Sequence, residues 1–177
     1  MTIQVGMLLF PRITQLDLTG PLEVFHRVPG AEVNLFWIAT QARTARYVTS
    51  VCTGALLLGA AGLLQGYQAA THWAYMDLLP LFGARPVRRR VVVDRDRITA
   101  GGVTAGIDFG LRIAAELAGD DVSRAIQLGL EYDPEPPFRS GHPDHAPAAV
   151  VAQVRNLLEP GVEAHRSKAR RWRAPSG

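Results

Sequence analysis

The sequence predicts a single α/β domain built on a parallel sheet with helices on both faces. Short apolar runs typical of buried strands alternate with helix-like segments, as in IQVGMLLF, GPLEVFHRV and VNLFWIA. The 177 residues, 47% of them hydrophobic, are enough for one domain with its own core. The single cysteine, Cys52, lies where a strand turns directly into a helix.

The N-terminal part reads as a βαβ unit followed by a third strand. Asp17 lies just past the carboxyl end of the first strand. Thr19 is expected to cap a short helix that has Pro21 in its first turn. The third strand, RYVTSV, leads into TGALLLGAAGLLQG, which fits a buried helix ending at Gly66.

The remaining elements follow in a regular order. They are a short strand at YQAAT, a helix from His72 to about Phe82, two strand-like runs PVRRRVVVD and RITA, the loop GGVTAG, the helices IDFGLRIAAELAG and DVSRAIQLGLEY, the proline-rich loop PEPPFRSGHPDHAP and the helix AAVVAQVRNLLE. We expect residues 1–160 to form the domain and residues 161–177 to form a basic flexible tail.

The connection between two of the strands is too short for a regular parallel sheet. Seven residues, Thr40 to Arg46, separate VNLFWIA from RYVTSV. Parallel neighbours need a connection of about a dozen residues or more, usually with a helix. The sequence therefore predicts an internal deletion near residue 40.

The composition indicates in which compartment the protein works and which partners it binds. No segment reaches the roughly 18 apolar residues of a membrane span, and the opening run IQVGMLLF has no basic residues before it, so we expect neither membrane insertion nor secretion. A lone thiol persists best in a reducing compartment, which predicts the cytoplasm. The small basic excess, 19 Lys and Arg against 16 Asp and Glu, gathers at Arg88–Arg90 and around Trp172. The basic residues around Trp172 could bind phosphates or an acidic partner, but we favour the interpretation that they belong to a solvated terminus.

Cys52 has the setting of a nucleophile. A sulfur at the start of a helix faces free backbone N–H groups, so we expect its thiolate to be favoured. Gly54 allows a tight turn behind the sulfur, as in a nucleophile elbow. The alternative is a buried cysteine that acts as a small hydrophobe. Asp17 should reach the same edge of the sheet and exchange protons there, unless it only caps the following helix turn.

Three further residues are candidates for the same pocket. Thr53 lies beside the sulfur in sequence, and Gly102 belongs to a turn that does not match a dinucleotide fingerprint. His72 is a candidate for a Cys-His pair, but Thr71 is equally suited to cap a helix with His72 packed in its first turn. The sequence contains no cluster typical of a zinc site and no Walker loop.

Five segments together are recognisable: LLFPRITQLDLTGP, RYVTSVCTGALLLGAAGLLQG, ATHWAY, GGVTAGIDFGL and EYDPEPPFRSGHPDHAP. In these motifs the chain resembles the ThiJ/PfpI superfamily, whose domain is similar to class I glutamine amidotransferases, and within it the isocyanide hydratases. SVCTGA and THW also resemble the sensor domains of AraC-type regulators. The tail beyond Glu159 lies outside the resemblance.

The resemblance implies a flavodoxin-like sheet, a homodimer and a hydro-lyase that converts an isocyanide to an N-substituted formamide through a cysteine thioimidate. It makes Cys52 the nucleophile, Asp17 the proton-transferring carboxyl and Thr53 the supporting residue, without a metal or cofactor. Relatives carry an additional central strand between the first strand and the nucleophile strand, ending in a Pro-Gly-Gly turn beside the cysteine. Its loss should open a gap in the sheet.

Two alternatives stay open. A non-catalytic sensor of small molecules would share the elbow, but DNA binding needs a helix-turn-helix domain for which the last segment is too short, so nucleic acid is not an expected partner. Another reaction of the superfamily at the same thiol, such as amide hydrolysis, would change the substrate and keep Cys52 as the nucleophile.

Overall fold

The computed structural model describes residues 3–8, 15–36 and 45–173. β1 (Ile3–Leu8) pairs in parallel with β2 (Ala31–Phe36), and α1 (Gln15–Phe25) connects them, which confirms the predicted βαβ unit. The start of the helix was predicted too late. α1 already begins at Gln15, so Asp17 lies in its first turn and Thr19 and Pro21 lie inside it.

A second sheet carries the cysteine. β3 (Val48–Ser50) is parallel to β7 (Arg97–Ala100), which pairs antiparallel with β6 (Val91–Asp94). The antiparallel hairpin makes the architecture mixed rather than purely parallel. β4 (Gln68–Ala69) and β5 (Arg85–Pro86) form a small parallel pair of their own.

The two main sheets are separate. Among the described residues, β1 pairs only with β2 and β3 pairs only with β7, so no ladder of hydrogen bonds joins β1 to β3. This confirms the expected gap between the first strand and the nucleophile strand. Residues 37–44, which include most of the short connection, lie outside the described residues.

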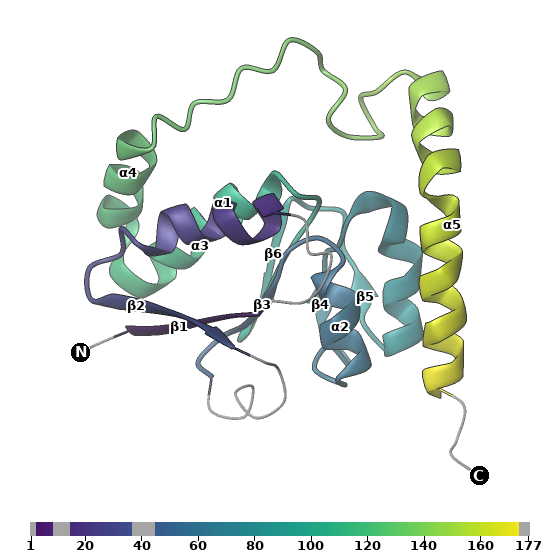
Figure 1. Cartoon of the computed structure of the whole chain (residues 1–177), viewed down its shortest axis with the longest axis horizontal. Coiled ribbons are helices and arrows are strands. Elements are labelled where there is room, and N and C mark those ends of the chain that lie inside the picture. The colour runs from purple at the N-terminus through teal and green to yellow at the C-terminus, as the bar shows by residue number, and fades with distance from the viewer. Residues whose placement is uncertain (1–2, 9–14, 37–44, 174–177) are drawn as a thin grey trace.

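Helices hold the two sheets in one core. Val5 and Met7 of β1 pack against the same buried cluster as Tyr47 and Val51, which flank β3. The cluster consists of residues from α1, β7 and α3 (Ala105–Ala118): Phe25, Ile98, Ala100, Ala105, Phe109 and Ile113. Figure 1 shows α1 and α3 lying together over β1 and β2.

The contact between α1 and α3 is close. The rings of Phe25 and Phe109 meet edge to face with their centroids 6.3 Å apart. A Cβ atom added at Gly110 would lie 2.9 Å from Val24 Cβ, so only glycine allows this approach. α4 (Asp120–Gly129) packs on the outer side of α3.

α2 (Gly54–Ala60) follows the cysteine and is shorter than predicted. The expected end at Gly66 is wrong because the chain leaves the helix after Ala60, and Gly62 takes a left-handed conformation with φ of +74°. The next helix is η2, a 3₁₀ helix over Trp73–Phe82, close to the predicted range.

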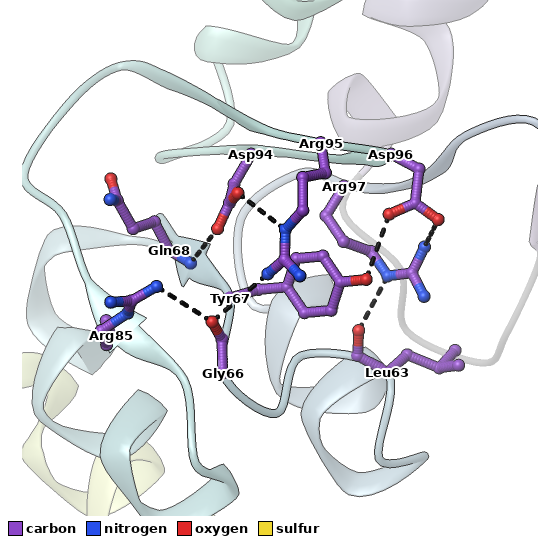
Figure 2. A network of polar contacts seen from close by, with 9 residues as sticks. All are labelled: Leu63, Gly66, Tyr67, Gln68, Arg85, Asp94, Arg95, Asp96 and Arg97. Atoms are coloured by element: carbon purple, nitrogen blue, oxygen red, sulfur yellow. Dashed lines mark hydrogen bonds and ion pairs between the residues drawn. The ribbon is translucent and has the colours of Figure 1, made fainter.

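A network of polar contacts ties the β6–β7 turn to the chain that follows α2 (Figure 2). The guanidinium of Arg95 lies 3.6 Å from the centre of the Tyr67 ring, and the Tyr67 hydroxyl donates to Asp96 at 3.2 Å. Arg97 Nε donates to the Leu63 carbonyl at 2.8 Å. These contacts hold the hairpin, and with it β7, beside the end of the elbow helix.

The last helix, α5, runs from Ala148 to Arg173 and packs on η2. It passes through residues 161–173, which the sequence analysis assigned to a flexible tail. Val162 and Ala169 are buried there, and the ring of His165 meets Tyr75 edge to face at 5.4 Å between centroids. Figure 1 shows this helix upright beside the rest of the fold. None of the helices in the described ranges is long and apolar enough to cross a membrane.

Candidate active site

Cys52 lies on a strained turn between β3 and α2. Its φ angle is +55°, a left-handed conformation that costs a residue with a side chain on the order of 1–3 kcal/mol. The Cys52 N–H donates to the carbonyls of Gly101 at 2.8 Å and Ala100 at 3.1 Å. The Thr71 hydroxyl donates to the Cys52 carbonyl at 2.7 Å. The predicted elbow is therefore present, and its backbone is held on both sides of the cysteine.

The sulfur is surrounded by hydrogen-bond donors. Hydrogen bonds from the backbone of Thr53, the backbone of Val103 and the Thr53 side chain all act to lower the pKa of the Cys52 thiol. Burial and the negative charge of Asp17 act in the other direction and are stronger, so they raise the pKa to about 11. The expectation of a favoured thiolate is thus wrong for the free chain. Cys52 is only 8% exposed, and α2 has only seven residues, so desolvation outweighs the helix terminus.

Asp17 of α1 interacts electrostatically with Cys52. The Asp17 carboxylate is close enough to raise the pKa of the thiol, so the structure brings these two predicted residues together. With its pKa raised to about 11, the Cys52 thiol keeps its proton near neutral pH beside the Asp17 carboxylate. This proton is available to a substrate that needs one.

His72 borders the site but does not pair with the sulfur. Its Nδ1 accepts the Ala74 N–H at 3.3 Å, so His72 itself caps η2, not Thr71. Its ring lies against Gly102, where an added Cβ would come 3.0 Å from His72 Cδ2. Burial lowers the pKa of His72, which favours the neutral form of the ring. This favours the structural alternative for His72.

Three residues that interact with Cys52 were not predicted as parts of the site by the sequence analysis. Val103 supplies a backbone N–H, and its place in GGVTAG before α3 was a usable signal because free N–H groups gather at helix starts. Thr71 was considered only as a helix cap. Tyr75 on η2 interacts electrostatically with Cys52. Burial is the main cause that raises the pKa of the Tyr75 phenol, and the charge of Cys52 adds to it.

The described residues hold no group of three or more His, Cys, Asp or Glu side chains that could bind a metal ion. The site offers a buried thiol, a neighbouring carboxylate and several N–H and hydroxyl donors. This arrangement suits covalent addition of sulfur to a small electrophile with transfer of a proton.

The chain belongs to the DJ-1/PfpI family, whose profile matches residues 26–116. It is 45% identical to isonitrile hydratase of Pseudomonas putida over an alignment that covers 92% of this chain and 93% of that protein. A crystal structure of a ThiJ/PfpI family protein from Pseudomonas syringae superposes with a TM-score of 0.89 at 35% identity, covering 95% of this chain and 90% of the other.

A regulator also matches, over a shorter range. The transcriptional regulator GbdR of Pseudomonas aeruginosa is 35% identical over 101 residues, which are 55% of this chain and 27% of the regulator. The alignment with isonitrile hydratase spans 212 positions, whereas 92% of the 177 residues here is about 163. About 50 positions of that relative therefore have no counterpart in this chain.

Proposed function

We propose that this chain is a hydro-lyase of the isonitrile hydratase type, which adds water to the carbon of an isocyanide, or isonitrile, and releases an N-substituted formamide. The observation that carries the proposal is the buried free thiol of Cys52 on a strained turn, with the Asp17 carboxylate close enough to raise its pKa. The 45% identity to isonitrile hydratase supports the choice of substrate class.

The first step joins sulfur and hydrogen to the same carbon. The isocyanide carbon takes the proton that the pair holds, with Asp17 as the relay, and becomes electrophilic. The Cys52 thiolate then forms the C–S bond, which gives a thioimidate with a C=N double bond. The carboxylate of Asp17 is left unprotonated. The hydrogen bonds from Thr53 and Val103 stabilise the thiolate while it forms.

The second step uses water. The Asp17 carboxylate takes a proton from a water molecule as the water oxygen attacks the thioimidate carbon, and it passes this proton to the nitrogen, so that the carboxylate can accept the hydroxyl proton on collapse. Collapse of this intermediate makes the C=O bond, breaks the C–S bond and returns a proton to the pair. The product is the N-substituted formamide, and no metal or cofactor takes part in the scheme.

The loss of the central strand should lower the rate of isocyanide hydration. We attribute the short connection near residue 40 to an internal deletion that removes the strand between β1 and β3, together with backbone donors beside the thiol. Each donor of this kind is worth on the order of 3 kcal/mol in comparable sites. We therefore expect this chain to be slower than relatives that keep the segment.

The sensor alternative has its own support, since the regulator GbdR is 35% identical over 55% of this chain. A sensor would bind an isocyanide or another small molecule without converting it. The remaining parts of the proposal are a homodimer, for which Leu128 and Phe138 offer exposed apolar surface, and a reducing compartment such as the cytoplasm, where the Cys52 thiol stays free.

The test is direct turnover. The chain is incubated with an aryl isocyanide and the formamide is measured by mass spectrometry, alongside Cys52→Ala, Asp17→Ala and a chimera that carries the additional segment of the Pseudomonas putida relative. Formamide that depends on Cys52 and Asp17, with a faster rate in the chimera, is the expected result. Turnover that persists in Cys52→Ala would refute the mechanism, and binding without turnover in all versions would favour the sensor.

A further inference from the structure

The peptide unit between Cys52 and Thr53 joins two contacts of the active site. On one side of this unit, the Cys52 carbonyl accepts the Thr71 hydroxyl at 2.7 Å. On the other side, the backbone of Thr53 hydrogen bonds to the Cys52 sulfur. A trans peptide unit is planar, so its C=O and N–H groups point in opposite directions and turn together. A bond that fixes the carbonyl therefore also fixes the direction of the N–H.

Thr71 is built into the fold at this place. It is 3% exposed and lies between β4 and η2, where the neighbouring Ala70 N–H donates to the Thr99 hydroxyl of β7 at 2.8 Å. The segment that carries Thr71 is thus held against the strand whose carboxyl end accepts the Cys52 N–H. The Cys52 N–H is held by β7 and the residue after it, and Thr71 holds the Cys52 carbonyl. Cys52, which lies between these contacts, has the strained φ of +55°.

We propose that Thr71 is a positioning residue for the nucleophile: its hydroxyl locks the peptide unit after Cys52 in the orientation that directs the Thr53 N–H at the sulfur. Donation to the carbonyl also polarises the unit and strengthens its N–H as a donor. Thr71 acts through the backbone and does not touch the substrate. The inference rests on the proposed function only in taking Cys52 as the reacting group.

The experiment compares the alkylation rate of Cys52 in Thr71→Val and Thr71→Ser with that in the unmodified chain. At pH values well below the thiol pKa, the rate with iodoacetamide is proportional to the thiolate fraction. Valine keeps the shape of threonine without the hydroxyl, and loss of one directed hydrogen bond should slow alkylation about three- to tenfold at pH 8. Serine keeps the hydroxyl and should restore the rate to within about twofold of the unmodified chain.

Thr99→Val is the matched control. Thr99 is fully buried, and its hydroxyl bonds to Ala70 in the same segment as Thr71, but it has no hydrogen bond to Cys52. Thermal melts of all variants identify any that are unfolded, and Thr71→Ala replaces Thr71→Val if that variant does not fold. Slow alkylation in Thr71→Val with normal rates in Thr71→Ser and Thr99→Val supports the proposal.

Three outcomes would overturn it. They are an unchanged or faster rate in Thr71→Val, an equally slow rate in Thr71→Ser, and an equally slow rate in Thr99→Val. The readout requires no isocyanide. A chain that alkylates as expected but forms no formamide would therefore keep the role of Thr71 and lose the proposed hydratase function, so the two failures can be told apart.

Discussion

Asp17→Asn should make Cys52 more reactive toward alkylation while it abolishes catalysis. Asp17 contributes a negative charge that opposes ionisation of the thiol, and asparagine removes this charge with little change in size. The same substitution removes the group that we propose to carry the proton to the isocyanide carbon. Reactivity and turnover should therefore change in opposite directions.

The magnitude follows from the pKa of Cys52. A rise from the ordinary 9.0 to about 11 lowers the thiolate fraction near neutral pH by about 100-fold. Burial is the larger cause and persists in the variant, so only the part that Asp17 contributes is recovered. We expect alkylation of Asp17→Asn to be on the order of tenfold faster between pH 7 and pH 9.

The assay is the iodoacetamide rate measured across pH, together with formamide production. Asp121→Asn is a suitable control because Asp121 also lies in the first turn of a helix but is exposed and pairs with Arg124. It should leave both measurements unchanged. An alkylation rate in Asp17→Asn equal to or below that of the unmodified chain would show that the Asp17 charge does not reach the sulfur, and the proposed proton-transfer scheme would fall.

Two other predictions concern stability and helix packing. The pKa of Cys52 is raised in the folded chain, so this thiol contributes on the order of 2–3 kcal/mol of stability that is fully present below about pH 9 and is lost as pH rises to about 11. Urea unfolding should therefore lose less stability between pH 8 and pH 10 in Cys52→Ser than in the unmodified chain, and equal losses would contradict the raised pKa. Gly110→Ala puts a Cβ atom 2.9 Å from Val24 and should push α1 from α3, costing about 1–3 kcal/mol in urea unfolding. If α1 positions Asp17, this variant should also alkylate faster at Cys52, and an unchanged rate would count against that role.

The order of elements was predictable from hydrophobic periodicity, but several boundaries were not. Pro160-Gly161 is a strong signal for the end of a helix, and the predicted helix stopped there. In the structure α5 continues through it, because burial of Val162 and Ala169 against the body stabilises the next turns. Gly161 has a packing role instead, since a Cβ there would lie 2.8 Å from the Tyr75 hydroxyl.

The positions of site residues that follow strand ends could be predicted from the sequence. The ionisation of the thiol, which depends on electrostatics, could not. The meeting of Asp17 with Cys52 follows from the rule that parallel strands present their carboxyl ends at one edge. The pKa of the thiol does not follow from that rule, because it depends on the balance between burial and the donors around the sulfur. Thr71 is distant from Cys52 in sequence, so its hydrogen bond to the elbow has no local pattern.

The split sheet changes what positions the catalytic pair. The contacts that hold Cys52 come from the half of the fold that contains β3 and β7, through the carbonyls of Ala100 and Gly101 and the hydroxyl of Thr71. Asp17 belongs to α1 in the other half, and no strand pairing links β1 to β3 within the described part of the chain. The contact of α1 with α3 is therefore one structural link between Asp17 and the thiol, because α3 follows directly from the loop that carries Val103. The loss of the central strand should accordingly disturb the position of Cys52 less than that of its acid–base partner, Asp17.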